Sequence, residues 1–262
     1  MPELAEVETF RRILHDALVG QRLDHVDAVE DTLVFDDVHP DVIQQALSGR
    51  TVVDTGRHGK HAWMSLDNGA HLLLHFGMSG SVVVEDGENI SHVKLRLQSA
   101  ANTVVYRCPR RIGRLRLRHD LYGEPPLSKL GPDPYTALPD ADDFASLFRR
   151  RQKTIKGMLL DQSILAGVGN WLADEVLYQS RIAPHRKAAS LDDNDIQLLR
   201  QRLQEVLALA VDVRADETHF PKHWLFHVRW GKQEDAATHD GLPLQFDTVA
   251  GRTTAWVPDL QS

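Results

Sequence analysis

The sequence predicts an α+β protein of two domains, an antiparallel β-sandwich with flanking helices followed by a helical domain that ends in a β-hairpin. Three observations support this class. Short strand-like patterns run through residues 50–118, and apolar residues recur at helical spacing in the second half of the chain. Between the two patterns, residues 122–135 contain four prolines and two glycines, which is typical of a linker.

The first predicted element is a helix at the N-terminus. Proline is favoured in a first helical turn, so Pro2 would open this helix, and the carboxylates of Glu3 and Glu6 would lie near its positive end. The apolar residues that this helix would bury are Leu4, Val7, Phe10, Leu14 and Leu18.

The strands of the sandwich are expected in short segments separated by Gly and Asp-Asn-Gly turns, which favour antiparallel neighbours. These segments are residues 51–53, 70–76, 81–84, 92–97 and 103–106.

Helical spacing dominates the second half of the chain. Residues 142–160 predict one helix, and Ser190-Leu-Asp-Asp193 resembles the capping box that begins another. The apolar stripe of that later helix is Ile196, Leu199, Leu203, Val206, Leu207 and Ala210. Residues 246–257 predict two strands around Ala250-Gly251. The predicted domains are therefore residues 1–121, a linker at 122–136, a helical domain at 137–228 and a terminal hairpin at 229–262.

The overall charge argues against a nucleic-acid partner, but its distribution argues for one. The 262 residues include 30 Lys and Arg against 37 Asp and Glu, a net charge of −7. Residues 24–41 hold seven acids and no Lys or Arg, whereas residues 89–119 hold eight bases and no acid. A second basic cluster comprises Arg149, Arg150, Arg151, Lys153 and Lys156. A polyanion would meet these basic segments, although a solvated basic face is the alternative.

Cysteine content and hydropathy limit the cellular compartments in which we expect the protein. The single Cys108 excludes a disulfide within the chain and any zinc site that needs two cysteines. The N-terminus has three glutamates and no apolar core of a signal peptide, and no apolar stretch approaches the ~18 residues of a membrane span. We expect a monomer located in the cytoplasm of a prokaryote or the nucleus of a eukaryote.

The first residues predict a reactive amine. The initiator methionine is normally removed before a small second residue, which would leave Pro2 with a free secondary amine. An α-amino group titrates near ~8, so part of it is unprotonated at neutral pH and can attack a carbonyl carbon to form an iminium. Taken alone, Pro2-Glu3 is also an ordinary helix start.

Several further motifs occur along the chain in a fixed order. They are Pro2-Glu3-Leu4-Ala5-Glu6-Val7-Glu8, Arg57-His58-Gly59-Lys60, His75-Phe76-Gly77-Met78-Ser79-Gly80, Cys108-Pro109-Arg110-Arg111-Ile112-Gly113, Ile155 to Gln162, Ala166 to Asn170, and Gly251-Arg252-Thr253-Thr254. Together they resemble the formamidopyrimidine-DNA glycosylase/endonuclease VIII superfamily over essentially the whole chain. The helical domain would then contain a helix-two-turns-helix motif.

The resemblance implies a bifunctional DNA glycosylase and abasic-site lyase that acts on double-stranded DNA with a damaged base or an abasic site, held between the domains. Pro2 would attack C1′ of a nucleotide flipped out of the duplex. Glu3 would be the general acid or base, with Glu6 in support, and β,δ-elimination would cut the strand. Lys60 would contact the phosphate next to the lesion.

The resemblance also implies DNA contacts. Lys156, Asn170 and Arg252 would clamp phosphates. Met78 would fill the hole left by the flipped nucleotide, and Arg110 would face the orphaned base, with Arg111 in the same DNA-binding loop. Ile112 stands where phenylalanine is usual and should be a weaker wedge. Cys108 replaces an aspartate, and we expect it to be a buried structural thiol.

No metal or other cofactor is expected. Val257-Pro258-Asp259-Leu260 stands where many superfamily members carry the second cysteine pair of a zinc finger, so the hairpin would be a zincless finger held by Phe246, Trp256 and Val257. A helix that would align His219, His223 and His227 is interrupted by Pro221.

Residues 220–231 form a short aromatic run where 8-oxoguanine enzymes carry a longer capping loop. This resembles lidless members of the superfamily, so formamidopyrimidines, hydantoins or oxidised pyrimidines are better candidate substrates than 8-oxoguanine. The alternative functions are a catalytically silent DNA-binding paralogue that recognises bent or abasic DNA, and an RNA-binding or ribosomal module. The retention of Pro2, Glu3 and Lys60 argues against both, since neither needs a proline amine.

Overall fold

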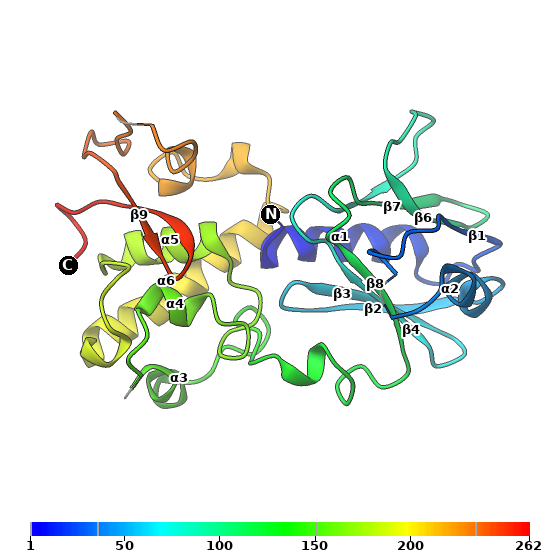
Figure 1. Cartoon of the computed structure of the whole chain (residues 1–262), viewed down its shortest axis with the longest axis horizontal. Helices are drawn as coiled ribbons and strands as arrows, with labels where there is room; N and C mark the ends of the chain where they lie inside the picture. Colours follow the sequence, from blue (N-terminus) through cyan, green and yellow to red (C-terminus); the bar gives the residue numbers. More distant parts are fainter. Residues whose placement is uncertain (1, 36, 150, 234) are drawn as a thin grey trace. The chain divides into compact units, whose positions relative to one another are not determined.

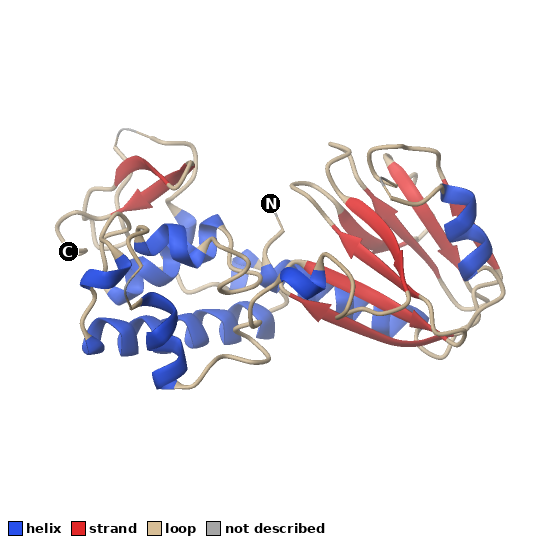
Figure 2. Ribbon diagram, turned by 60° about the horizontal axis from the view of Figure 1, so that its bottom comes forward, coloured by secondary structure: helices blue, strands red, loops and turns tan. Residues whose placement is uncertain are grey.

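The computed structural model describes residues 2–35, 37–149, 151–233 and 235–262 (Figure 1). Met1, Asp36 of the acidic run and Arg150 of the second basic cluster therefore lie outside the described residues. The chain forms two units, Met1–Lys129 and Leu130–Ser262, and the boundary falls within the segment 122–136. Strands dominate the first unit and helices the second (Figure 2).

The first unit contains two four-stranded antiparallel sheets, in the orders β1-β6-β7-β5 and β2-β3-β4-β8. The strands are β1 (His25–Ala28), β2 (Val52–His58), β3 (His61–Leu66), β4 (His71–His75), β5 (Ser81–Val84), β6 (Val93–Gln98), β7 (Thr103–Arg107) and β8 (Arg114–Arg118). The predicted sandwich is confirmed. Strands β1, β3 and β8 were not expected from the sequence. In β8 arginine alternates with leucine, a pattern that resembles a run of positive charge.

Helix α1 (Leu4–Leu18) packs against strands of both sheets, and α2 (Pro40–Leu47) packs against β1. The predicted stripe of α1 is confirmed, since Leu4, Val7, Leu14 and Leu18 are buried. Phe10 is half-buried and its ring lies 4.6 Å from that of Phe76. The N-terminal helix is therefore part of the core, and this packing holds its first turn, which contains Glu6, in place.

The second unit consists of helices α3 (Ala141–Phe148), α4 (Ile155–Leu159), α5 (Asn170–Ser180) and α6 (Asp193–Asp212), and a hairpin of β9 (Gln245–Val249) and β10 (Arg252–Trp256). Short 3-10 turns are η1 (Leu127–Lys129, in the first unit), η2 (Ala188–Ser190), η3 (Glu217–His219) and η4 (Leu225–His227). The whole predicted stripe of α6 is buried, and the predicted hairpin is present. Helix α5 lies between α6 and β10 and contacts both, so it is the central element of this unit.

Two sequence predictions about helix ends are wrong. The single helix expected at 142–160 is two helices, because Arg149 leaves helical geometry and the hydroxyl of Thr154 caps a new helix by accepting a hydrogen bond from the Gly157 N–H. The capping box of α6 lies two residues later than expected. Asp192 is the cap and Asp195 its partner, because Ser190 ends the turn η2.

Among the described residues, no helix is both long enough and apolar enough to span a bilayer.

Candidate active site

The first turn of α1 fixes the residue next to Pro2. Glu3 is the N-cap, and its N–H donates a 3.0 Å hydrogen bond to Oε2 of Glu6, while its own carboxylate accepts from the backbone of Glu6. Pro2 therefore precedes the helix, and the prediction that it opens the first turn is wrong, because Glu3 has extended backbone geometry. Only 2% of Glu3 is exposed, so its carboxylate is desolvated beside the proline.

Lys60 lies at the tip of the β2–β3 hairpin. His58 pairs with His61, which leaves a two-residue turn of Gly59 and Lys60. Gly59 has φ +57°, the left-handed backbone that such turns require and that glycine adopts without strain. The turn therefore presents Lys60 at a fixed position, and the side chain is partly exposed.

A buried ion pair connects the Lys60 hairpin to α1. Nε of Arg57 lies 3.2 Å from Oε2 of Glu8, and Nη1 of Arg57 donates a 3.0 Å hydrogen bond to the carbonyl of Gly59. Glu8 also binds Arg11 and Arg12. Burial alone would raise the pKa of Glu8, but the hydrogen bond and charge of Arg11, the charge of Arg57 and the hydrogen bond of Arg12 lower it overall. Glu8 therefore holds the turn of Lys60 against the helix that follows Pro2.

Two histidines lie together beside this hairpin. The ring centroids of His61 and His75 are 4.9 Å apart. Burial, followed by the positive charges of Arg116, Lys60 and Arg114, lowers the pKa of His75 to about 4. Burial and the neighbouring His75 also lower the pKa of His61. Both rings are therefore neutral at physiological pH.

The structure brings together three predicted DNA-contacting residues of two loops. Met78 and Ile112 are 41% and 38% exposed, and Arg110 is also exposed. The N–H of Arg110 donates a 3.3 Å hydrogen bond to Oγ of Ser79. Gly77 lies so close to the neighbouring loop that a Cβ there would come within 2.6 Å of the backbone of Ile112. The two loops therefore form one surface.

Arg111 anchors this loop to Asp31. Its guanidinium binds Asp31 through Nε at 2.8 Å and Nη2 at 3.1 Å, and Lys94 binds the same carboxylate at 2.8 Å. Burial would raise the pKa of Asp31, but the hydrogen bonds of Arg111, Lys94 and two backbone N–H groups hold it well below its usual range. Arg111 thus has a structural partner besides any phosphate.

Cys108 is fully buried, as expected, and its Sγ accepts a 3.3 Å hydrogen bond from the N–H of Gly113. The thiol thereby joins the two ends of the 108–113 loop.

In the second unit, Lys156 is fully buried. Its Nζ lies 2.5 Å from Oδ1 of Asp174 and 2.7 Å from Oγ1 of Thr254, and it donates to the carbonyl of Thr253 at 3.3 Å. The prediction that Lys156 contacts a phosphate directly is therefore wrong, because no part of its side chain is accessible. It connects α4 to α5 and β10 instead.

Asn170 and Arg252 lie at the ends of the elements that Lys156 connects. Asn170 is the first residue of α5, and its Nδ2 donates a 2.9 Å hydrogen bond to the carbonyl of Thr253, which follows the exposed Arg252. The N-cap of α5 is Gly169, which supplies no side-chain cap. The N–H groups of this first turn and the guanidinium of Arg252 are therefore suited to an anion.

Three further buried charged residues, Asp174, Glu175 and Arg229, were not expected from the sequence. Oδ2 of Asp174 binds Arg229 at 2.6 Å and accepts from the N–H of Ala255 at 3.2 Å. Burial raises the pKa of Glu175 to about 7, and its Oε2 accepts a 2.8 Å hydrogen bond from the N–H of Phe226. The signal available in the sequence was two adjacent acids in a helix that contains no other charged residue.

Comparison with known proteins identifies the family. Residues 1–115 match the formamidopyrimidine-DNA glycosylase N-terminal domain, and residues 130–222 match the formamidopyrimidine-DNA glycosylase H2TH domain. The chain belongs to the formamidopyrimidine-DNA glycosylase family. It is accordingly a DNA glycosylase of base excision repair with abasic-site lyase activity.

Relatives match this glycosylase along its length. The formamidopyrimidine-DNA glycosylase of Arabidopsis thaliana is 35% identical over all of the chain and 71% of the relative, and that of Thermus thermophilus is 35% identical over all of the chain and 98% of the relative. A point mutant of the Lactococcus lactis enzyme in complex with Fapy-dG-containing DNA has a TM-score of 0.87 at 28% identity, with full coverage of both chains. The same enzyme bound to DNA with an AP site has a TM-score of 0.87 at 29% identity, with 99% of each chain covered.

The basic run of this glycosylase is not uniformly available to DNA. At least five of its eight bases pair with carboxylates: Lys94 and Arg111 with Asp31, Arg116 and Arg118 with Asp37, and Arg96 with Glu85. These five bases therefore have partners within the protein besides any phosphate. Two acids of the acidic run, Asp31 and Asp37, thus pair with four bases of the basic run within the first unit.

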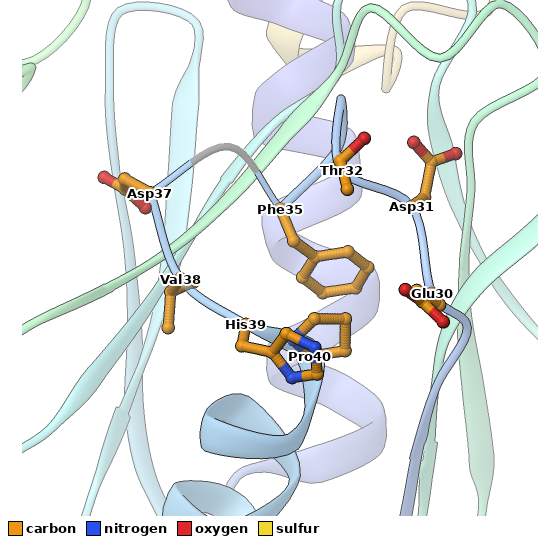
Figure 3. A pocket seen from close by; sticks show the side chains of 8 residues that line it. All are labelled: Glu30, Asp31, Thr32, Phe35, Asp37, Val38, His39 and Pro40. Carbon is orange, nitrogen blue, oxygen red and sulfur yellow. The ribbon is translucent and has the colours of Figure 1, made fainter.

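A pocket of about 340 Å³ lies in the acidic segment, lined by residues 30–32, 35 and 37–40. In Figure 3 the carboxylates of Glu30 and Asp31 lie on one side of the Phe35 ring and that of Asp37 on the other. This acidic lining is unsuited to a phosphate.

The terminal hairpin has its own apolar support. Val257 and Ala255 are buried with Leu225 and Leu244, and Phe246 packs against them. The indole N–H of Trp256 donates a 2.7 Å hydrogen bond to Asp247. Within the described ranges, no group of three or more His, Cys, Asp or Glu side chains has the arrangement of a metal site, and His219 and His227 lie in separate turns.

Proposed function

We propose that this glycosylase excises a damaged base from double-stranded DNA through a Schiff base on mature Pro2 and then cuts the strand on both sides of the abasic site. The arrangement of α1 carries the proposal. The capping box fixes Glu3, the residue that follows Pro2 in the chain, and the Glu8–Arg57 pair connects the same helix to the turn of Lys60. A protein that only bound DNA would not need Pro2, Glu3 and Lys60 together.

The reaction uses the amine as nucleophile. The Pro2 nitrogen forms a bond to C1′, the glycosidic bond breaks, and the base leaves with that electron pair and a proton. Glu3 supplies or accepts protons as the sugar ring opens. The resulting iminium acidifies the C2′ hydrogen, whose loss breaks the C3′–O bond. A further elimination breaks the C5′–O bond, and hydrolysis of the iminium frees Pro2.

DNA binding divides between the two units. Met78, Arg110 and Ile112 would enter the space left by the extruded nucleotide, and the Lys60 ammonium would contact the adjacent phosphate. Asn170, Arg252 and the first turn of α5 would hold backbone phosphates. The enzyme would act as a monomer, in the cytoplasm of a prokaryote or the nucleus of a eukaryote.

Formamidopyrimidines, hydantoins or oxidised pyrimidines are the proposed lesions, and 8-oxoguanine a poor one, because residues 220–231 form a short aromatic segment anchored to α5. Single-turnover excision from matched duplexes tests this ranking. Formamidopyrimidine should be released faster than 8-oxoguanine paired with cytosine, and equal rates would contradict the proposal.

The ends of the cut strand test the elimination steps. An end-labelled duplex with an abasic site should yield a one-nucleotide gap with phosphate at both ends. A chain that retains Met1 should leave the strand intact, since its amine is displaced from the site. An unsaturated aldehyde as the sole 3′ end would show that elimination stops at the first step, and the proposed double elimination would be wrong.

A further inference from the structure

Gln261 is a buried amide just beyond the terminal hairpin. Only 3% of the residue is exposed, although glutamine is usually a surface residue. Its Oε1 accepts a 2.7 Å hydrogen bond from the N–H of Val257, and its Nε2 donates a 2.9 Å hydrogen bond to the carbonyl of Ile182. Val257 directly follows β10, and Ile182 lies just beyond the end of α5. The side chain therefore joins the end of the hairpin strand to the end of the helix.

The amide suits the two backbone groups that it joins. The N–H of Val257 can only donate and the carbonyl of Ile182 can only accept, so the group between them must accept on one side and donate on the other. A primary amide does both without carrying a charge, whereas a carboxylate could make only the first bond and an ammonium only the second. Both backbone groups are buried, and either would destabilise the fold if it lost its partner.

The main chain on both sides of this amide is also held. The N–H of Gln261 donates to the carbonyl of Val257 at 2.9 Å, which closes a turn. The N–H of Ser262 donates to the carbonyl of Arg181 at 3.1 Å, and the carbonyl of Ser262 accepts from the N–H of Ala183 at 3.1 Å. These backbone bonds fix the position from which the Gln261 side chain extends.

The other end of β10 is attached to the beginning of α5. The carbonyl of Thr253 accepts from Asn170, and the N–H of Ala255 donates to Asp174. Together with the Gln261 amide, these bonds attach β10 to α5 at two separate points. Two attachments fix the direction of a short strand, whereas one would let the strand pivot. The first residue of this strand is the exposed Arg252.

We propose that Gln261 is a positioning residue for DNA binding, which acts on Arg252 through the direction of β10. This inference rests on the proposed function, in which Arg252 holds a backbone phosphate. A guanidinium binds a phosphate through donors of fixed geometry, so a small rotation of the strand that carries it weakens the contact. Gln261 itself is buried and does not touch the DNA.

A double-mutant cycle tests the inference, with the full chain titrated against a duplex that contains a tetrahydrofuran abasic analogue. Gln261→Met has a similar volume and removes both side-chain bonds, so it should weaken binding about fivefold and reduce the salt dependence of the affinity by about one phosphate contact. In a chain that already carries Arg252→Ala, adding Gln261→Met should change the affinity by less than about twofold, because the contact that it positions is gone. Gln245→Met replaces an exposed glutamine of β9 and is the matched control, which should change neither quantity.

Hydrogen exchange of the same variants separates positioning of the hairpin from general stability. Gln261→Met should accelerate amide exchange in residues 245–257 and leave exchange in α6 unchanged.

Three results would overturn the inference. The first is an equal loss of affinity with and without Arg252, and the second is no loss of affinity in Gln261→Met. The third is faster exchange throughout the second unit, which would make Gln261 a general support of the fold. Failure of the proposed phosphate contact is a separate result, since Arg252→Ala alone would then bind the duplex as tightly as the parent chain.

Discussion

At the scale of single residues, Arg57 joins the two parts of the proposed catalytic site. It binds Glu8 through Nε and the carbonyl of Gly59 through Nη1 at once, and the rigid plane of the guanidinium fixes the positions of these two donors, which a single ammonium nitrogen does not. Glu8 and Arg57 are 49 residues apart in the chain, so their contact could not be predicted from the motifs that contain them. The sequence provided the candidates Pro2, Glu3 and Lys60, and the structure adds what positions them.

We predict that Arg57→Lys lowers kcat for base excision at least about tenfold, with a smaller change in KM, because the turn of Lys60 loses its anchor. Single-turnover kinetics and thermal melting would measure the effect. Arg12→Ala removes a more exposed partner of the same Glu8 and should lower the free energy of unfolding by less than about 1 kcal/mol. If Arg57→Lys were as active as the parent, the anchoring role would be refuted.

Ile112 makes a second prediction at this scale. Ile112→Phe should tighten binding to a tetrahydrofuran duplex about fivefold, because an aromatic ring stacks on the bases beside the gap where isoleucine only packs. Val84→Phe places the same ring at another exposed apolar position of the first unit and is the control. Fluorescence anisotropy would measure both. Equal tightening in the two variants would show non-specific contact.

At the scale of elements, the buried pair of Lys156 and Asp174 decides how the hairpin is attached to α5. The order of strands and helices was largely predictable, because apolar spacing reports on which face is buried, as the stripe of α6 shows. The role of Lys156 was not, because a motif match does not show whether a side chain points to solvent or into the core. The break between α3 and α4 depends on the cap at Thr154, which the apolar pattern does not report.

We predict that Lys156→Met destabilises the second unit by about 3–5 kcal/mol, because Asp174 remains buried with one cation fewer. The same variant should bind DNA more weakly, since Lys156 anchors the hairpin that carries Arg252. Lys153→Met removes an exposed lysine paired with Asp161 and should cost less than about 1 kcal/mol. Denaturant unfolding of both variants would measure the difference, and equal costs would contradict the anchoring role.

At the scale of the whole molecule, the net charge of −7 was a poor guide to partners, and the pairing of the acidic and basic runs explains why. Linear sequence shows that charges are segregated but not that the segregated runs meet. Several bases of the basic run therefore have carboxylate partners within the protein, and we propose that exposed bases such as Arg110 and Arg252 meet the DNA.

The buried carboxylates predict how stability depends on pH. The pKa of Glu175 is raised in the folded state to about 7, so its contribution is fully present below about pH 4.5 and is lost as pH rises toward 7, by about 3 kcal/mol. The lowered pKa values of Glu8 and Asp31 act in the opposite sense, and their contribution is lost as pH falls below about 4.5. Glu175→Gln should therefore gain in melting temperature relative to the parent between pH 5 and pH 8. A difference that does not change with pH would show that Glu175 does not titrate in this range.

The central claim is that the secondary amine of Pro2 is the nucleophile, and borohydride trapping tests it most directly. Borohydride reduces an iminium to a stable amine, so the mature chain incubated with an abasic-site duplex and borohydride should become covalently joined to the DNA strand. Pro2→Gly, and a chain that retains Met1, should give far less adduct. No adduct from the parent chain, or equal yields from all three proteins, would contradict the account.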